Sequence, residues 1–177
     1  MACADEIIAI ALKVMPDEIT LVPEKRQELT TEGGLDIVTH ADTTRSAVER
    51  LKAAGLHVSL FIDPDLTQLD MAKKLHADAI EFQTASYSEA TTPAQVAVEL
   101  AKLRKATAHA LELGLHPHLG HGLNYQNVKP IVRIHGVVEL NIGHSIVARA
   151  MFAGLEQAVR DMKLAMSEHY PHTRATV

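Results

Sequence analysis

Residues 57–82 of the chain read HVSLFIDPDLTQLDMAKKLHADAIEF, and this stretch decides the fold class. His57–Ile62 and Ala79–Phe82 are short apolar runs, typical of strands that are covered on both faces. Between them, Thr67–Leu75 has apolar residues at the spacing of one helix face. A strand, a helix and a second strand without a tight-hairpin signal predict parallel strands joined by a crossover, and therefore an α/β protein.

The same alternation continues on both sides of this unit. Further strand-like runs occur at Ile19–Val22, Leu115–Leu119 and Val137–Ile142, which makes about five strands in total. The sequence has no long linker and no low-complexity tract, so we expect one domain over residues 1–177. Further helices are predicted at Asp5–Val14, Ser46–Ala54, Pro93–Leu113 and Ser145–Met166.

Two architectures fit this pattern: an open doubly wound sheet, or part of a (β/α)8 barrel. The predicted helix Asp5–Val14 precedes every strand, although a helix in such folds normally crosses over from a strand. A complete barrel usually needs ~200 residues or more, and the chain has 177. These two features favour an incomplete barrel that begins partway through the fold.

Composition restricts the partners and the location. Apolar residues make up 47% of the chain and charged residues 22%, which is ordinary for a globular protein. The formal net charge of −5 argues against nucleic acid as a partner. Cys3 is the only cysteine, so no internal disulfide can form. No apolar run approaches the ~18–20 residues of a membrane span, and no signal peptide is recognised, so we expect no membrane partner and a cytoplasmic location.

Ligands of parallel βα folds bind at the carboxyl ends of the strands. Gly143-His144-Ser145 follows the last predicted strand and opens the last predicted helix. A glycine lets the backbone approach an anion closely, and the free N–H groups of a helix start can bind phosphate. The alternative is that Gly143 only makes a tight turn and Ser145 only caps the helix.

Two further residues at strand ends are candidates for proton transfer. His121 stands between Gly120 and Gly122, which leaves its imidazole exposed near a strand end. Glu81 lies inside an apolar strand, where a carboxylate is costly unless it is paired or used. The alternatives are an ordinary loop histidine for His121 and a structural salt bridge for Glu81.

A long polar stretch follows the first predicted strand. It contains Lys25-Arg26, the hydroxyls of Thr30 and Thr31, and the paired glycines Gly33-Gly34. Long loops with paired glycines are often lids, and these side chains suit a phosphorylated ligand. A solvated surface loop is the alternative.

Histidines also raise the question of a metal site. His116 and His118 share one face of a predicted strand, and His121 follows shortly afterwards. No aspartate or glutamate at ligand spacing follows nearby, and a chain with 11 histidines produces such groups by chance. We therefore expect no metal, with a His-dependent metallohydrolase as a minor alternative.

Several of these segments together resemble the pyridoxine 5′-phosphate synthase family of vitamin B6 biosynthesis. The similarity covers essentially the whole chain, and several motifs in one order are more specific than any single motif. They are LVPEKRQELTTEGGLD (21–36), VSLFID (58–63), Ile80-Glu81, GHGLNY (120–125), Asn127-Val128 and ELNIGH (139–144).

The resemblance implies a (β/α)8 barrel and a function. Such an enzyme condenses 3-amino-2-oxopropyl phosphate with 1-deoxy-D-xylulose 5-phosphate, giving pyridoxine 5′-phosphate, phosphate and water, without a cofactor. The resemblance also implies a homo-oligomer. By matching motif, His121 corresponds to the proton donor, Glu81 to the transition-state stabiliser and Thr30 to a deoxyxylulose phosphate contact, while Gly122, Gly143 and His144 correspond to contacts with the aminoketone phosphate.

The same resemblance implies that the family's amino-terminal segment, with its first strands, a proton-accepting histidine and a catalytic glutamate, has no counterpart here. We therefore expect residues 1–177 alone to be inactive. A non-catalytic, phosphate-binding remnant of the family is the alternative.

Overall fold

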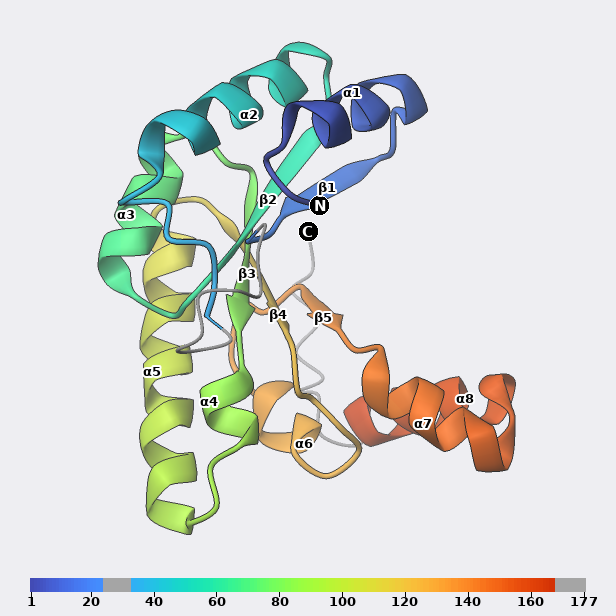
Figure 1. The fold of residues 1–177 in the computed structure, drawn as a ribbon. Coiled ribbons are helices and arrows are strands. Elements are labelled where there is room, and N and C mark those ends of the chain that lie inside the picture. Colours follow the sequence, from blue (N-terminus) through green and yellow to red (C-terminus); the bar gives the residue numbers. More distant parts are fainter. Residues whose placement is uncertain (24–32, 168–177) are drawn as a thin grey trace, which may run out of the picture.

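The computed structural model of the chain describes residues 1–23 and 33–167. Within them, five parallel strands form one sheet that curls into a half-barrel with flanking helices (Figure 1). The strands are β1 (Glu18–Leu21), β2 (His57–Ile62), β3 (Ala79–Gln83), β4 (His116–Gly120) and β5 (Glu139–Asn141). Their order in the sheet is their order in the chain. A doubly wound sheet reverses its strand order at a switch point, so the expected incomplete barrel is confirmed.

Helices connect successive strands as crossovers. The helices are α1 (Asp5–Val14), α2 (Ala41–Ala53), α3 (Leu66–Lys74), α4 (Ala85–Ser88), α5 (Pro93–Glu112), α6 (Val128–Ile131), α7 (His144–Ala153) and α8 (Leu155–Ser167). Two of them, α3 and α5, begin with a side-chain cap among the described residues. The Thr92 side chain accepts a hydrogen bond from the backbone of Gln95, and the Gln95 side chain bonds back to Thr92. Among the described residues, no helix combines the length and the apolarity that crossing a membrane requires.

The two faces of the sheet differ in chemistry because strand residues alternate between faces. Leu60, Ile62, Ile80 and Phe82 are fully buried and pack with the helices in the main hydrophobic core. The strand register aligns a second row across four strands, which consists of Phe61, Glu81, His118 and Glu139. Polar and ionisable groups therefore gather on the face that the main core does not use.

The predicted single helix Ser145–Met166 is wrong. The structure divides it at Gly154, whose backbone has φ 79° and ψ 152°, well outside the helical region. Glycine adopts this conformation without a steric penalty, so α7 ends there and α8 begins at Leu155. The two helices lie side by side (Figure 1), and Arg149 Nε donates to Asp161 Oδ2 across the pair at 2.7 Å.

Candidate active site

A cavity of about 490 Å³ lies at the carboxyl ends of β3, β4 and β5. The residues that line it include five of the six predicted for the site, namely Glu81, His121, Gly122, Gly143 and His144. The sixth, Thr30, lies outside the described residues. A more open hollow of about 580 Å³ lies beside Tyr125 and Phe152 and contains neither Glu81 nor His121. The smaller cavity is therefore the one with the chemistry of an active site.

Glu81 combines burial with a shifted proton affinity. The residue is 9% exposed, and burial raises the pKa of its carboxyl to about 7, because the charged form loses its hydration. A hydrogen bond from the Asn141 side chain opposes this shift, and the nearby charge of Glu139 adds to it. At neutral pH the carboxyl populates both protonation states, so it can donate or accept a proton.

The backbone beside this carboxyl is shaped to receive it. A Cβ atom added to Gly120 would lie 2.0 Å from Glu81 Oε1, so a side chain at this position would displace the carboxyl. The sequence analysis interprets Gly120 as a residue that leaves the His121 imidazole exposed, and does not predict its close approach to Glu81. It also passed over the role of Asn141, although an amide at the end of a strand, facing a carboxylate, was the available signal.

His121 has a left-handed backbone with φ 77°, which is uncommon for a residue other than glycine. The turn is held by Thr84, whose hydroxyl lies 2.8 Å from the carbonyl oxygen of Gly120 and 2.5 Å from that of His121. The imidazole is exposed and meets the ring of Phe61 edge-on, with 6.3 Å between centroids. The fold thus presents His121 at the mouth of the cavity.

The start of α7 opens onto the same cavity. No side chain of the described residues caps this helix. The Ser145 hydroxyl donates instead to the carbonyl oxygen of Leu123 at 2.9 Å. The alternative that Ser145 caps the helix is therefore wrong. A Cβ atom added to Gly143 would meet no atom of the described part of the chain within 4 Å. Uncapped N–H groups beside open space are suited to an anion.

The polar stretch after β1 is described only in part. Gly34 N–H donates to Asp63 Oδ1 at 3.0 Å, and a Cβ atom on Gly34 would lie 2.4 Å from the backbone of Ile62. This close contact fastens the carboxyl-terminal end of the stretch to the end of β2. Lys25-Arg26 and Thr31 lie, like Thr30, outside the described residues.

The histidine trio considered for a metal does not form one ligand group. Within the described residues, possible ligand atoms of His118, Glu18 and Glu139 lie within 4.8 Å of one another. Neither His116 nor His121 belongs to that group.

Comparison with known proteins agrees with the fold and the motifs. The family model described as pyridoxal phosphate biosynthesis protein PdxJ matches residues 1–168. A curated relative from Synechococcus sp. (strain JA-2-3B'a(2-13)), named pyridoxine 5′-phosphate synthase, is 52% identical over 166 residues, which are 94% of this chain and 70% of the relative. A relative of the same name from Geobacter sp. (strain M21) is 52% identical over 162 residues, which are 92% of this chain and 68% of the relative.

Solved structures show similarity of fold alone. The BexX/CysO complex from Amycolatopsis orientalis matches with a TM-score of 0.54 and 16% identity, over 96% of this chain and 64% of that one. A putative fructose-1,6-biphosphate aldolase from Coccidioides immitis matches with a TM-score of 0.54 and 16% identity, over 93% of this chain and 56% of that one. The family model and the curated relatives decide the assignment: the chain belongs to the PdxJ family of pyridoxal phosphate biosynthesis proteins.

Proposed function

We propose that this chain carries the His121 and Glu81 part of a pyridoxine 5′-phosphate synthase site, which condenses 3-amino-2-oxopropyl phosphate with 1-deoxy-D-xylulose 5-phosphate. The products are pyridoxine 5′-phosphate, phosphate and water, and no cofactor takes part. The observation that carries the proposal is the meeting of a proton-transfer pair and an uncapped helix start in one cavity. The printed names of the curated relatives support it.

The chemistry needs repeated proton transfers. Imine formation, loss of water and ring closure each require an acid in one step and a base in another. Glu81, with a pKa of about 7, serves either role at neutral pH and stabilises positive charge when it is ionised. His121 is the proposed proton donor to the substrate oxygen that leaves as water, and its exposed position at the cavity mouth supports this role.

The aminoketone phosphate binds at the start of α7, which no side chain caps within residues 1–23 and 33–167. Gly122 and Gly143 line the approach to it. Thr30 is proposed to contact the deoxyxylulose phosphate.

A Gly143→Val substitution tests the phosphate contact. Among the residues that the structure describes, no atom lies within 4 Å of the added Cβ, so the fold should remain, while the isopropyl group fills the approach to the helix start and should weaken binding. We expect the dissociation constant for the aminoketone phosphate to rise about tenfold, equivalent to about 1.4 kcal/mol. Isothermal calorimetry measures it, with Ala153→Val at the far end of α7 as the matched control. Equal affinities for the two variants would refute the contact.

The proposal includes a requirement for more chain. A polypeptide of residues 1–177 alone should not form pyridoxine 5′-phosphate, because the proton acceptors of the family lie on a segment with no counterpart in it. The chain also spans only about 70% of the curated relative from Synechococcus. Losing one member of a catalytic set can cost as much as losing all of them.

A coupled assay of residues 1–177, with and without a separately expressed amino-terminal segment of a family member, tests the function. Turnover only in the mixture supports it. Turnover by residues 1–177 alone would overturn the requirement for more chain. A mixture that binds phosphate without turnover would identify a non-catalytic remnant, and hydrolysis of phosphate esters that depends on a metal would identify the metallohydrolase.

We also propose that the chain self-associates in the cytoplasm. None of the ten residues of α7 is buried, and Met151 and Phe152 are 80% and 94% exposed. Monomeric proteins rarely leave such an apolar surface uncovered, which supports contact with a second copy.

A further inference from the structure

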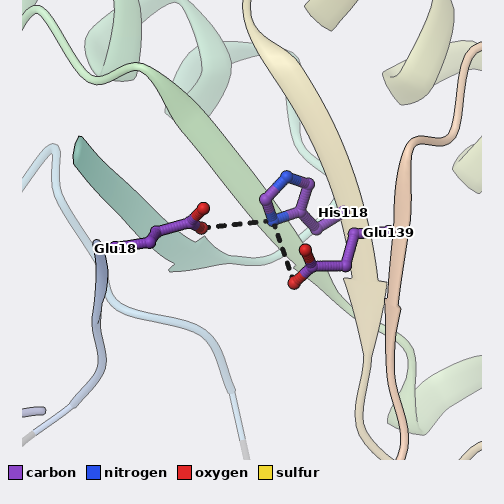
Figure 2. Close-up of side chains that lie close together, drawn as sticks. All are labelled: Glu18, His118 and Glu139. Carbon is purple, nitrogen blue, oxygen red and sulfur yellow. Dashed lines mark ion pairs between the residues drawn. The ribbon is translucent and has the colours of Figure 1, made fainter. Parts of the chain in front are cut away.

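Three side chains from three separate strands converge on one point (Figure 2). One of them, His118, is aligned with Glu81 of the candidate active site in the strand register. Glu18 begins β1, His118 is the middle residue of β4, and Glu139 begins β5. Their ligand atoms all lie within 4.8 Å of one another. Since β1 and β5 are the two outer strands of the sheet, the group spans the whole curl.

The distances within this group suit a shared ion better than direct hydrogen bonds. His118 Nδ1 lies 3.5 Å from Glu18 Oε1 and 3.7 Å from Glu139 Oε1. A good hydrogen bond between these atoms would be about 2.7–3.2 Å long. A tetrahedral ion with bonds of about 2.0–2.2 Å instead holds its ligand atoms about 3.3–3.6 Å apart.

The imidazole supplies a second, independent observation. His118 is 4% exposed, and its Nδ1 has no hydrogen-bond partner in the described part of the chain. A buried polar atom without a partner costs about 1–3 kcal/mol, so such atoms in native proteins usually meet a ligand or water. This nitrogen is aimed at two carboxylates, of which Glu139 is half-exposed and leaves a route from solvent.

We propose that Glu18, His118 and Glu139 bind a divalent transition-metal ion such as Zn²⁺, with water completing its coordination. The imidazole nitrogen favours such an ion over Mg²⁺ or Ca²⁺, which prefer oxygen ligands. The ion ties β1 to β5 across the concave face and neutralises two carboxylates. This proposal departs from the expectation of no metal. The sequence analysis looked for acidic ligands close to the histidines along the chain, whereas Glu18 and Glu139 lie on other strands, remote in sequence from His118. The metal site is independent of the proposed condensation.

Calorimetric titration of EDTA-treated, dialysed residues 1–177 with ZnCl₂ tests the site. We expect one site in the wild type, weakened ~100-fold or more in His118→Gln and in Glu139→Gln. His135→Gln and Glu49→Gln, both at exposed positions outside the group, serve as matched controls and should bind as the wild type does. Circular dichroism of each variant checks the fold, and the half-exposed Glu139 is the position less sensitive to substitution.

A second readout separates this site from adventitious binding to other histidines. Zn²⁺ should raise the thermal midpoint of the wild type and of both controls, and should leave the midpoint of Glu139→Gln unchanged. Equal zinc affinity in Glu139→Gln and the wild type would overturn the proposal. So would an absence of zinc binding by the wild type.

Discussion

Replacing His121 by alanine is expected to lower the turnover of the complemented enzyme by ~10²–10⁴-fold, the usual effect of removing one general acid or base. The side chain is exposed at the mouth of the cavity and meets the edge of the Phe61 ring, outside the main hydrophobic core, so its loss should leave the fold intact. The variant should therefore retain the wild-type thermal midpoint while losing activity. Steady-state kinetics with both substrates measure the effect.

Two comparisons make this result specific to proton transfer. His135→Gln, at another exposed histidine, should retain wild-type turnover. Added imidazole should restore part of the activity of His121→Ala, because a small acid can enter the open cavity mouth. Wild-type turnover in His121→Ala would remove His121 from the mechanism.

The second large effect is expected from Glu81→Gln, in both activity and stability. Folding raises the pKa of this carboxyl from 4.5 to about 7, so the folded state holds the proton more tightly than the unfolded state. The stability that this preference provides is fully present below about pH 4.5 and is lost as the pH rises through about 7. The glutamine side chain carries no charge at any pH. The free energy of unfolding of Glu81→Gln should therefore rise relative to that of the wild type across this pH range, by up to about 3 kcal/mol at pH 8.

Urea denaturation of both proteins between pH 4.5 and pH 8, in buffer with EDTA, measures the difference. Glu49→Gln, at an exposed position on α2, should show a difference from the wild type that does not grow over this range. Turnover of Glu81→Gln in the complemented enzyme should also fall by ~10²–10⁴-fold. A stability difference independent of pH would show that the carboxyl is not buried in the way described.

Periodicity was sufficient for most of the fold. The strand His57–Ile62 and the helix Asp5–Val14 have the bounds that their apolar spacing predicts. Both elements depend on the spacing of apolar residues within a short segment, and this spacing is regular in each of them. The helix Ser145–Met166 was mispredicted because its apolar stripe continues past Gly154, and the stripe cannot reveal that the backbone there has φ 79°. One glycine inside a helix costs only about 1 kcal/mol of stability relative to alanine. Tertiary packing can outweigh this amount, so the glycine alone does not decide whether a helix continues or ends.

For the candidate site too, features that depend on local sequence could be predicted, and features that depend on contacts between strands could not. His121 and Gly143 could be selected because each follows a strand, and parallel strands bring their ends together. Glu81 could be selected because a carboxylate inside an apolar strand is costly unless it is paired or used. The space that Gly120 leaves for the Glu81 carboxyl depends on contact between two strands, which spacing along one strand does not contain. The grouping of Glu18 with His118 is even harder to predict from the sequence, because it depends on how far the whole sheet curls.

The order of strands in the sheet also has a consequence for how the protein is made. Each strand pairs with the one synthesised immediately before it, from β1 through β5. As the chain leaves the ribosome, each of the strands β2 to β5 follows the synthesis of the neighbour that precedes it in the sheet, so this pairing needs no later part of the sequence. Backbone cuts between successive strand–helix units should therefore be tolerated better than cuts within them, which makes the loops between units the places to divide this barrel into fragments that reassemble.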